Sequence, residues 1–523
     1  MSEQSSTGMK KTLGLTGVTI NAMALIAPGA FLWITYQLQA ANVDSAGNST
    51  AGDMWTGIVL ALIIAFLTAL AFAELARRYP DAGTGSSYYF AEKAFLDREN
   101  PAHRRWARLA KFITGWAAHL FYWVYPGVMV AFMATLCAYI AGVFGITLDV
   151  LPQIIICVLF AAAVAAIAYR GISGSTNVAI AINVIQLTAL VVFSILCIVF
   201  RATNPLHVVA SADPTAGWFF KSAGSVITPK NLGGLLFQST IAILILVGFE
   251  SSTALAAEAK DPKRDIPRGV ILSLIIQGLF AYLFEYFAAN YALSDKLVSA
   301  DGKLSGIAAA GASGAPIGDL AVQIGNALLG GNGQALMIIL AITVAIAIIG
   351  TTLAAMNTGV RISFAMAQDK EMPDIMGLLH GKYATPHMGI IIMAIVSAII
   401  GAIGVAGGVV TLTGITLASN LGTFVLYGMI CFVTIVAFVG TGSFNFVTHA
   451  IIPVLGLIGN AIMVLAIFVI GISSGGTTAQ ATYLGLGIAA VWLVFSVVYF
   501  ILNSRATGKP IIPPVAAMSG SGD

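Results

Sequence analysis

Charged residues are scarce in this 523-residue chain. Only 9% of the residues are Asp, Glu, Lys or Arg, whereas 58% are hydrophobic and the mean hydropathy is +0.93. Soluble domains carry about 25% charged residues, so the composition excludes an ordinary water-soluble protein of this length. Apolar runs longer than about 18 residues recur along the chain, and each is long enough to cross a bilayer as a helix. The sequence therefore predicts an all-α integral membrane protein.

Cysteine and the usual catalytic motifs are also missing or rare. The four cysteines all fall within apolar runs and lack metal-ligand spacing, so we interpret them as small core residues. The chain has no HExxH motif, no GxSxG motif and no pair of intramembrane aspartates. We therefore expect no enzyme activity, no metal site, no cofactor and no nucleic-acid partner. The expected partners are the lipid bilayer and a small molecule.

Twelve apolar runs have the length of transmembrane helices. We place them at residues 13–40, 54–79, 111–142, 152–169, 176–200, 232–258, 268–293, 334–366, 388–406, 409–438, 447–472 and 481–502. If both termini are cytoplasmic, 20 of the 25 Lys and Arg residues lie on the cytoplasmic side. By the positive-inside rule, this asymmetry predicts a multi-pass protein of the plasma (inner) membrane with both termini inside. Residues 91–111, which are charged and partly amphipathic, are expected to form a cytoplasmic surface helix or a solvated loop.

The sixth span contains a carboxylate, Glu250, deep in its apolar run and directly after Gly248 and Phe249. A charged side chain at bilayer depth costs roughly 2.5–3.5 kcal/mol, so such residues usually face a cavity or a partner. The run Gly-Phe-Glu-Ser-Ser also has the small residues that allow a membrane helix to unwind. The alternative is a kinked helix whose Glu is paired only for packing.

The first span is interrupted as well. It contains the run Ala27-Pro28-Gly29-Ala30, in which proline removes a backbone donor and glycine permits an unwound backbone. A simple proline kink would explain this run alone. Breaks at matching places five spans apart, however, are the sequence signature of a transporter binding site.

Other polar residues within the spans are weaker candidates. His119 and Tyr122 lie in the aromatic third span, where a histidine relays protons, binds substrate or simply packs with a hydrogen bond. Asn183 and Gln186 lie in the fifth span, where such amides often only bridge helices. Thr351 and Thr352 lie in the eighth span; paired hydroxyls ligate a hard cation or bond back to their own helix.

Three segments together resemble the amino acid–polyamine–organocation (APC) superfamily of permeases, over nearly the whole chain. They are GFESS…AEAKDPKRDIPRG at 248–269, AFAELARRYPDAG at 71–83, and VRISFAMAQDKEMPDIM at 360–376 followed by ATPH at 384–387. The resemblance implies a LeuT-like 5+5 inverted repeat with broken helices 1 and 6 plus two extra helices. The chain would then divide into an N-terminal tail, a first repeat, an external loop, a second repeat, two accessory helices and a C-terminal tail, at residues 1–12, 13–200, 201–231, 232–438, 447–502 and 503–523.

The resemblance also implies where the substrate and the coupling ion bind. Amides near the first break, from Ile26 and Ala27 to Ala30, would hold a carboxylate, although Pro28 supplies no amide hydrogen. Carbonyls from Ile243, Leu244 and Ile245 to Gly248 would accept from the substrate ammonium group. Glu250 aligns with a span-six Glu of related exchangers and is the leading proton carrier. A sodium site would draw on the first break and on Thr351 or Thr352, so the coupling ion is H⁺ or Na⁺.

The sequence thus predicts a secondary transporter of amino acids that works by alternating access, as an ion-coupled or exchange permease. The aliphatic run before Gly248 favours a neutral, hydrophobic amino acid. Two alternatives remain open. One is a polyamine or organic-cation transporter on the same fold, with Glu250 as counter-ion, and the other is a channel or a transporter-like sensor.

Overall fold

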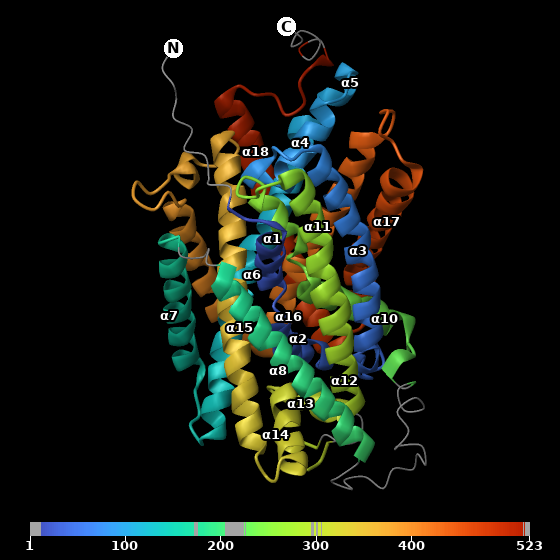
Figure 1. Cartoon of the computed structure of the whole chain (residues 1–523), viewed down its shortest axis with the longest axis vertical. Coiled ribbons are helices and arrows are strands. Elements are labelled where there is room, and N and C mark those ends of the chain that lie inside the picture. The colour runs from blue at the N-terminus through green and yellow to red at the C-terminus, as the bar shows by residue number, and fades with distance from the viewer. Residues whose placement is uncertain are drawn as a thin grey trace.

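The computed structural model describes residues 12–171, 176–203, 224, 226–293, 298–299, 302–304, 306–515 and 517 (Figure 1). Within these ranges the chain forms long helices, which is the all-α architecture that the composition predicts. Their bounds are α1 Leu15–Ile26, α2 Pro28–Ala40, α3 Met54–Arg78, α4 Ser87–Leu96, α5 Pro101–Arg104, α6 Ala107–Val143, α7 Val150–Tyr169, α8 Thr176–Thr203, α10 Leu232–Leu246, α11 Pro262–Leu274, α12 Leu283–Leu293, α13 Gly306–Ala312, α14 Pro316–Leu328, α15 Gly333–Gln368, α16 His387–Phe438, α17 Ile452–Ala466 and α18 Gly476–Thr507.

Eleven helical segments of the described chain are long and apolar enough to cross a membrane. The longest, α16, has 52 residues and would measure about 78 Å if straight, more than twice the hydrocarbon thickness of about 30 Å. Its helical geometry is interrupted at Gly408, where φ is 65° and ψ is −160°. This interruption lies between the spans predicted at 388–406 and 409–438.

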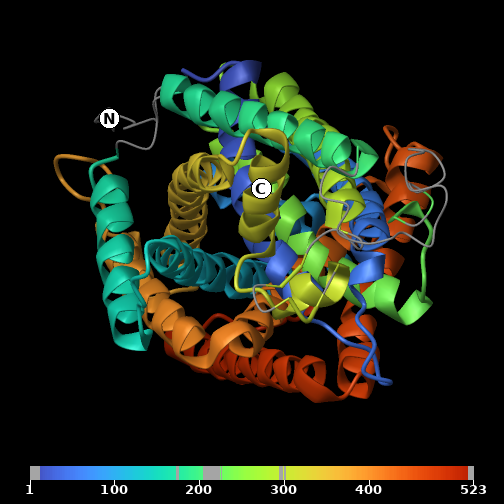
Figure 2. The ribbon, with the colours of Figure 1, turned by 90° about the horizontal axis from the view of Figure 1, so that it is seen from below.

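The ends of the bundle carry different elements. In Figure 1, α4, α5 and the C-terminal end of α18 lie at one end, and α13 and α14 lie at the other. Figure 2, which looks along the bundle, shows α8 at one edge and α18 at the opposite edge, with α1 and α2 between them. The first helix pair is therefore enclosed by other helices, which suits a site inside the bundle.

Most of the predicted N-terminal tail, most of the predicted external loop and the end of the predicted C-terminal tail fall outside the described residues. This holds for residues 1–11, for 204–223 and 225, and for 516 and 518–523. Where the structure does describe the C-terminal segment, α18 continues to Thr507, five residues beyond the predicted end of the last span at 502.

The surface helix predicted over residues 91–111 is wrong in its form. The chain instead makes α4, the short α5 and the start of α6, and α4 buries Tyr88, Ala91 and Phe95 on one face against α6. The buried Lys111 bonds Glu92 at 2.5 Å and Asp369 at 3.0 Å, which ties α4 and α6 to the end of α15. The prediction failed because these residues occupy i, i+3 and i+7 of a helix that starts at Ser87 and faces inward.

Candidate functional site

The first membrane helix is broken at a single residue. α1 ends at Ile26, Ala27 has left-handed dihedrals (φ 36°, ψ 67°), and α2 begins at Pro28. Proline disfavours the helical conformation in the residue before it, and it starts the second half-helix at the position where its missing amide hydrogen costs least. The predicted unwound stretch of residues 27–30 is therefore shorter than expected, because residues 28–30 already belong to α2.

Most backbone groups at this break already have partners. The Ala27 amide donates to the Met23 carbonyl at 3.1 Å, and the Ala30 amide donates to the Ala27 carbonyl at 3.1 Å. Both amides are therefore already bonded in this conformation, and the expectation that they hold a substrate carboxylate stays a prediction. The Gly29 amide has no hydrogen-bond partner among the described residues, and it is the donor that remains at the positive end of α2.

The carbonyls at the end of α1 are held by side chains from other helices. The Leu25 carbonyl accepts from Thr351 Oγ1 at 2.7 Å and from Tyr125 Oη at 3.2 Å. The Ile26 carbonyl accepts from Tyr282 Oη at 2.6 Å. Side chains from α6, α15 and the segment before α12 thus take the place of the next helical turn and stabilise the break.

The sixth span is also broken, and the two breaks touch. α10 ends at Leu246, and Gly248 follows with φ 126° before a 3₁₀-helix over Phe249–Leu255. A Cβ atom on Gly248 would lie 2.9 Å from the Cβ of Leu25 and 3.1 Å from Cγ1 of Ile26. Glycine is needed here for its positive φ and for this close approach.

The end of α10 supplies buried acceptors. Ile243, Leu244 and Ile245 are fully buried. The Ile243 carbonyl accepts from the Val247 amide at 3.1 Å, but the Leu244 and Ile245 carbonyls accept no hydrogen bond from outside the helix among the described residues. From the sequence we expected the carbonyls from Ile243 to Gly248 to accept from the substrate ammonium group. Of these, the Ile243 carbonyl already accepts from Val247, and the Gly248 carbonyl accepts from the Ser251 amide at 3.0 Å.

Glu250 lies beside the break with each of its oxygens hydrogen-bonded. Oε1 accepts from Tyr122 Oη at 2.9 Å, and Oε2 accepts from Tyr427 Oη at 2.8 Å and from the Gly248 amide at 2.9 Å. The side chain is 3% exposed, and the ring of Phe249 lies against Tyr427. Donors from α6, α16 and its own turn thus anchor this carboxylate and use three of its roughly four acceptor positions.

A group of amides lies on the other side of the first break. Gln277 Nε2 donates to Asn183 Oδ1 at 2.9 Å. Gln186 is 1% exposed, and no described residue hydrogen-bonds its Oε1. This oxygen lies 3.4 Å from the position that a Cβ on Gly29 would occupy. Gln186 is thus the fifth-span residue that the structure brings to the break, and it offers a free acceptor there.

The two threonines of α15 differ in their roles. Thr351 donates to the Leu25 carbonyl and also shares a 3.0 Å hydrogen bond with Tyr125. Thr352 donates to the Ile348 carbonyl of its own helix at 2.6 Å. Both hydroxyls therefore have protein partners, and only Thr351 is directed to the break.

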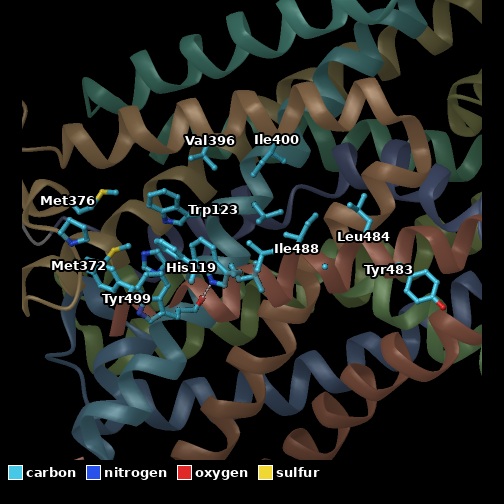
Figure 3. A pocket seen from close by; sticks show the side chains of 18 residues that line it. His119, Trp123, Met372, Met376, Val396, Ile400, Tyr483, Leu484, Ile488 and Tyr499 are labelled. Atoms are coloured by element: carbon cyan, nitrogen blue, oxygen red, sulfur yellow. Dashed lines mark hydrogen bonds between the residues drawn. The ribbon is translucent and has the colours of Figure 1, made fainter. Parts of the chain in front are cut away.

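His119 lies away from the break. Its ring nitrogens contact the Gly115 carbonyl at 2.7 Å and Ser363 Oγ at 2.8 Å. It lines a cavity of about 800 Å³ between α6, α16 and α18, with Trp123, Ile400 and Tyr483 among the other lining residues (Figure 3). The polar atoms of this histidine are satisfied within the protein, as the packing interpretation expects.

Hydrogen bonds and an ion pair connect the start of α1 and α15 to the segment after the sixth-span break. The Glu258 carbonyl accepts from the Thr12 and Leu13 amides at 3.0 Å, and the Lys260 amide donates to the Leu13 carbonyl at 2.8 Å. Arg361 of α15 pairs with Glu258 at 2.7 Å. The start of helix 1 is therefore bound to the segment that follows helix 6.

Several residues at the site were not singled out from the sequence. Three tyrosines were missed: Tyr125 and Tyr282 bond the carbonyls at the first break, and Tyr427 bonds Glu250. Their spans contain many aromatic residues, so the sequence did not distinguish these three from the others. Glu285 was detectable, because it is a carboxylate within the apolar seventh span and the argument that singled out Glu250 applies to it equally. Gln277, also in that span, was detectable as an intramembrane amide.

A many-helix membrane protein with a buried, polar-lined interruption in two of its helices belongs to the class of membrane transporters. A family model described as "Amino acid permease" matches residues 17–439, and the chain belongs to this family. Membership implies a transporter of amino acids or related organic cations rather than an enzyme.

Two of the relatives carry names that give different substrates, and a third is an uncharacterized transporter. The chain is 25% identical over 392 residues to the low-affinity putrescine importer PlaP of Escherichia coli K12, covering 74% of each chain. It is 26% identical over 356 residues to the branched-chain amino acid permease BcaP of Lactococcus lactis, covering 66% of this chain and 67% of that one. An uncharacterized transporter of Mycobacterium tuberculosis is 24% identical over 487 residues, covering 92% of this chain and 91% of that one.

Proposed function

We propose that the protein is a secondary active transporter that carries a neutral, apolar amino acid across the cell membrane by alternating access. It would have twelve spans, with α16 counted as two that meet at Gly408, in a LeuT-like 5+5 inverted repeat followed by two accessory helices. The observation that carries this proposal is the contact between the two helix breaks, where Gly248 meets Leu25 and Ile26.

The groups at this contact suit a zwitterion. The free Gly29 amide, at the positive end of α2, would donate to the substrate carboxylate. The carbonyls of Leu244 and Ile245, at the negative end of α10, would accept from the ammonium group. Because Ile26, Ala30 and Ile243 around them are fully buried and apolar, a hydrophobic side chain fits this site best.

Orientation follows from the charges at the closed end. Arg361, which pairs with Glu258, lies on α15 two turns before Asp369, which bonds Lys111. The stretch 77–111, which ends at Lys111, carries eight of the 25 Lys and Arg residues. By the positive-inside rule this end would face the cytoplasm, with both termini there. The conformation described would then be closed toward the cytoplasm.

The hydroxyls of Thr351 and Thr352 on α15 are the predicted ligands of a coupling sodium ion. A sodium site needs several oxygen ligands. Thr351 and Thr352 each donate to a carbonyl, but their oxygens keep lone pairs that a cation could use, so the coupling ion is either H⁺ or Na⁺. Transport in sodium-free buffer would remain at the full rate if the proton alone drives uptake.

A second candidate substrate is a polyamine or another organic cation, as the name of the Escherichia coli relative suggests. Such a substrate needs a carboxylate as its counter-ion. Glu250 already accepts from Tyr122, Tyr427 and the Gly248 amide, which uses three of the roughly four acceptor positions of a carboxylate. Because little of its hydrogen-bonding capacity is left for an ammonium group, the neutral amino acid is the better proposal.

The test is a thermal-shift screen of purified protein with leucine, arginine and putrescine, followed by counterflow of the labelled hit in proteoliposomes. A ligand at about 100 times its Kd stabilises by about 2.7 kcal/mol, so the true substrate raises the melting temperature. We expect stabilisation and counterflow with leucine. Stabilisation by putrescine alone would favour the organic cation, and ion currents without counterflow would indicate a channel.

A further inference from the structure

A second buried carboxylate, Glu285, lies on α12 and has no role in the site described above. Its side chain is 2% exposed, and within the described part of the chain neither of its oxygens has a hydrogen-bond partner. Glu250 is equally buried but accepts three hydrogen bonds. The two intramembrane carboxylates therefore differ in their surroundings, since Glu250 has three donors and Glu285 has none among the residues described.

The groups around Glu285 do not compensate a negative charge. Cys197 of α8, Tyr282 of the segment before α12 and Tyr286 of α12 face Glu285. Around them, Tyr36 of α2 lies against Tyr286, and Arg201, one turn after Cys197, lies over Tyr291. From α3, Trp55 bonds the Leu283 carbonyl at 2.8 Å, and α13 has no titratable side chain.

Arg201 is the cation on the described part of α8, but its guanidinium lies over the Tyr291 ring, 5.8 Å from the centroid, and makes no ion pair with Glu285. An ionised carboxylate buried without a partner costs several kcal/mol even after relaxation of its surroundings. Burial without a partner therefore favours the protonated form of Glu285.

Glu285 is also positioned to affect the first helix break. It stands three residues after Tyr282 and one before Tyr286, whose hydroxyls bond the Ile26 carbonyl at 2.6 Å and the Phe31 carbonyl at 3.4 Å. These carbonyls lie on the two sides of Ala27. The segment Ile275–Tyr282 just before Glu285 is a π-helix, a local irregularity that is frequent at functional sites.

Loss of the proton would change which acceptor the tyrosines bond. A hydroxyl that donates to a carboxylate makes a hydrogen bond roughly twice as strong as one to a neutral carbonyl. An ionised Glu285 would therefore attract the hydroxyls of Tyr282 and Tyr286 and release the Ile26 and Phe31 carbonyls. The break held closed by these tyrosines would then be free to rearrange.

We propose that Glu285 is the proton-binding site of the transport cycle, with its proton bound while Tyr282 and Tyr286 hold the first break. One proton enters from water on one side of the membrane, is held by a Glu285 oxygen, and leaves to water on the other side. This inference rests on the proposed transport function, and it assigns the coupling role to Glu285 and a structural role to Glu250.

The direct test is infrared spectroscopy of the protein in liposomes, which detects the carbonyl stretch of a protonated carboxyl group without any substrate. Near neutral pH, the wild type should show such a band, Glu250→Gln should keep it, and Glu285→Gln should lose it. A wild-type spectrum identical to that of Glu285→Gln would overturn the proposal. Because Gln has the shape of a protonated Glu, Glu285→Gln should fold. If it does not fold, Glu285→Asp replaces it, and the expected result is then a shift of the carbonyl band.

The second arm measures labelled leucine uptake with and without an inward proton gradient. Stimulation by the gradient should disappear in Glu285→Gln, persist with a displaced pH profile in Glu285→Asp, and persist unchanged in Cys197→Ser. Gradient stimulation of the wild-type size in Glu285→Gln would contradict the inference. If the wild type takes up no leucine, the proposed substrate fails, and the infrared arm alone decides the role of Glu285.

Discussion

The contact between the two helix breaks can be tested at one atom, by the substitution Gly248→Ala. Gly248 has a φ of 126°, and an added Cβ would lie 2.9 Å from the Cβ and Cγ of Leu25. The unfavourable backbone costs about 1–3 kcal/mol and the overpacking a further 1–3 kcal/mol, so the total is about 2–6 kcal/mol. If the strain is relieved by separating the breaks, even 2 kcal/mol lowers the binding-competent population about 30-fold.

The assay is leucine counterflow in proteoliposomes, normalised to the amount of inserted protein, together with the melting temperature of the purified protein. Gly428→Ala is the matched control, because Gly428 is a buried helical glycine whose added Cβ would meet atoms only at 3.6 Å and 3.8 Å. This control should keep its activity and gain about 0.5–1 kcal/mol of stability. A Gly248→Ala protein with wild-type counterflow and an unchanged melting temperature would refute the reasoning.

Three further substitutions examine the surroundings of the breaks. Glu250→Gln weakens hydrogen bonds worth about 1.5–3 kcal/mol each, so it should lower both the melting temperature and leucine uptake. Tyr427→Phe should do the same to a smaller degree. Unaltered values in both variants would mean that the hydrogen bonds of Glu250 are dispensable. Arg361→Ala removes the pair with Glu258, whose side chains are about one-quarter exposed and which is worth at most about 1 kcal/mol. It should raise hydrogen–deuterium exchange of α1 up to about fivefold, whereas equal exchange would show that the pair does not close this end. Tyr282→Phe frees the carbonyl at the end of α1 and should slow uptake without unfolding the protein; uptake at the wild-type rate would exclude this tyrosine from the cycle.

Much of the architecture could be predicted because backbone groups inside the bilayer must form hydrogen bonds within the protein. Apolar runs of sufficient length must be helical, so the span edges agree with the helices to within a few residues over most of the chain. The breaks were also predictable, since Pro28 and Gly248 have backbone restrictions that act locally. Their contact in space followed only from the family resemblance.

The partners of each polar group were not predictable from the sequence. The sequence marks Glu250 as an intramembrane carboxylate, but its tyrosine donors come from helices 128 and 177 residues away along the chain. The Ala30 amide is unavailable because α2 resumes its helical bonds at once, which depends on how tightly the chain turns at Ala27. Residue type and spacing therefore indicated which residues matter, while packing determined which of their atoms stay free.

The most direct test of the account is an electron cryo-microscopy map of the protein in lipid with saturating leucine. The account predicts that the first and sixth helices are interrupted at Ala27 and Gly248. It also predicts ligand density between the Gly29 amide and the carbonyls of Leu244 and Ile245. Uninterrupted helices, or leucine bound only in the cavity between α6 and α18, would contradict it.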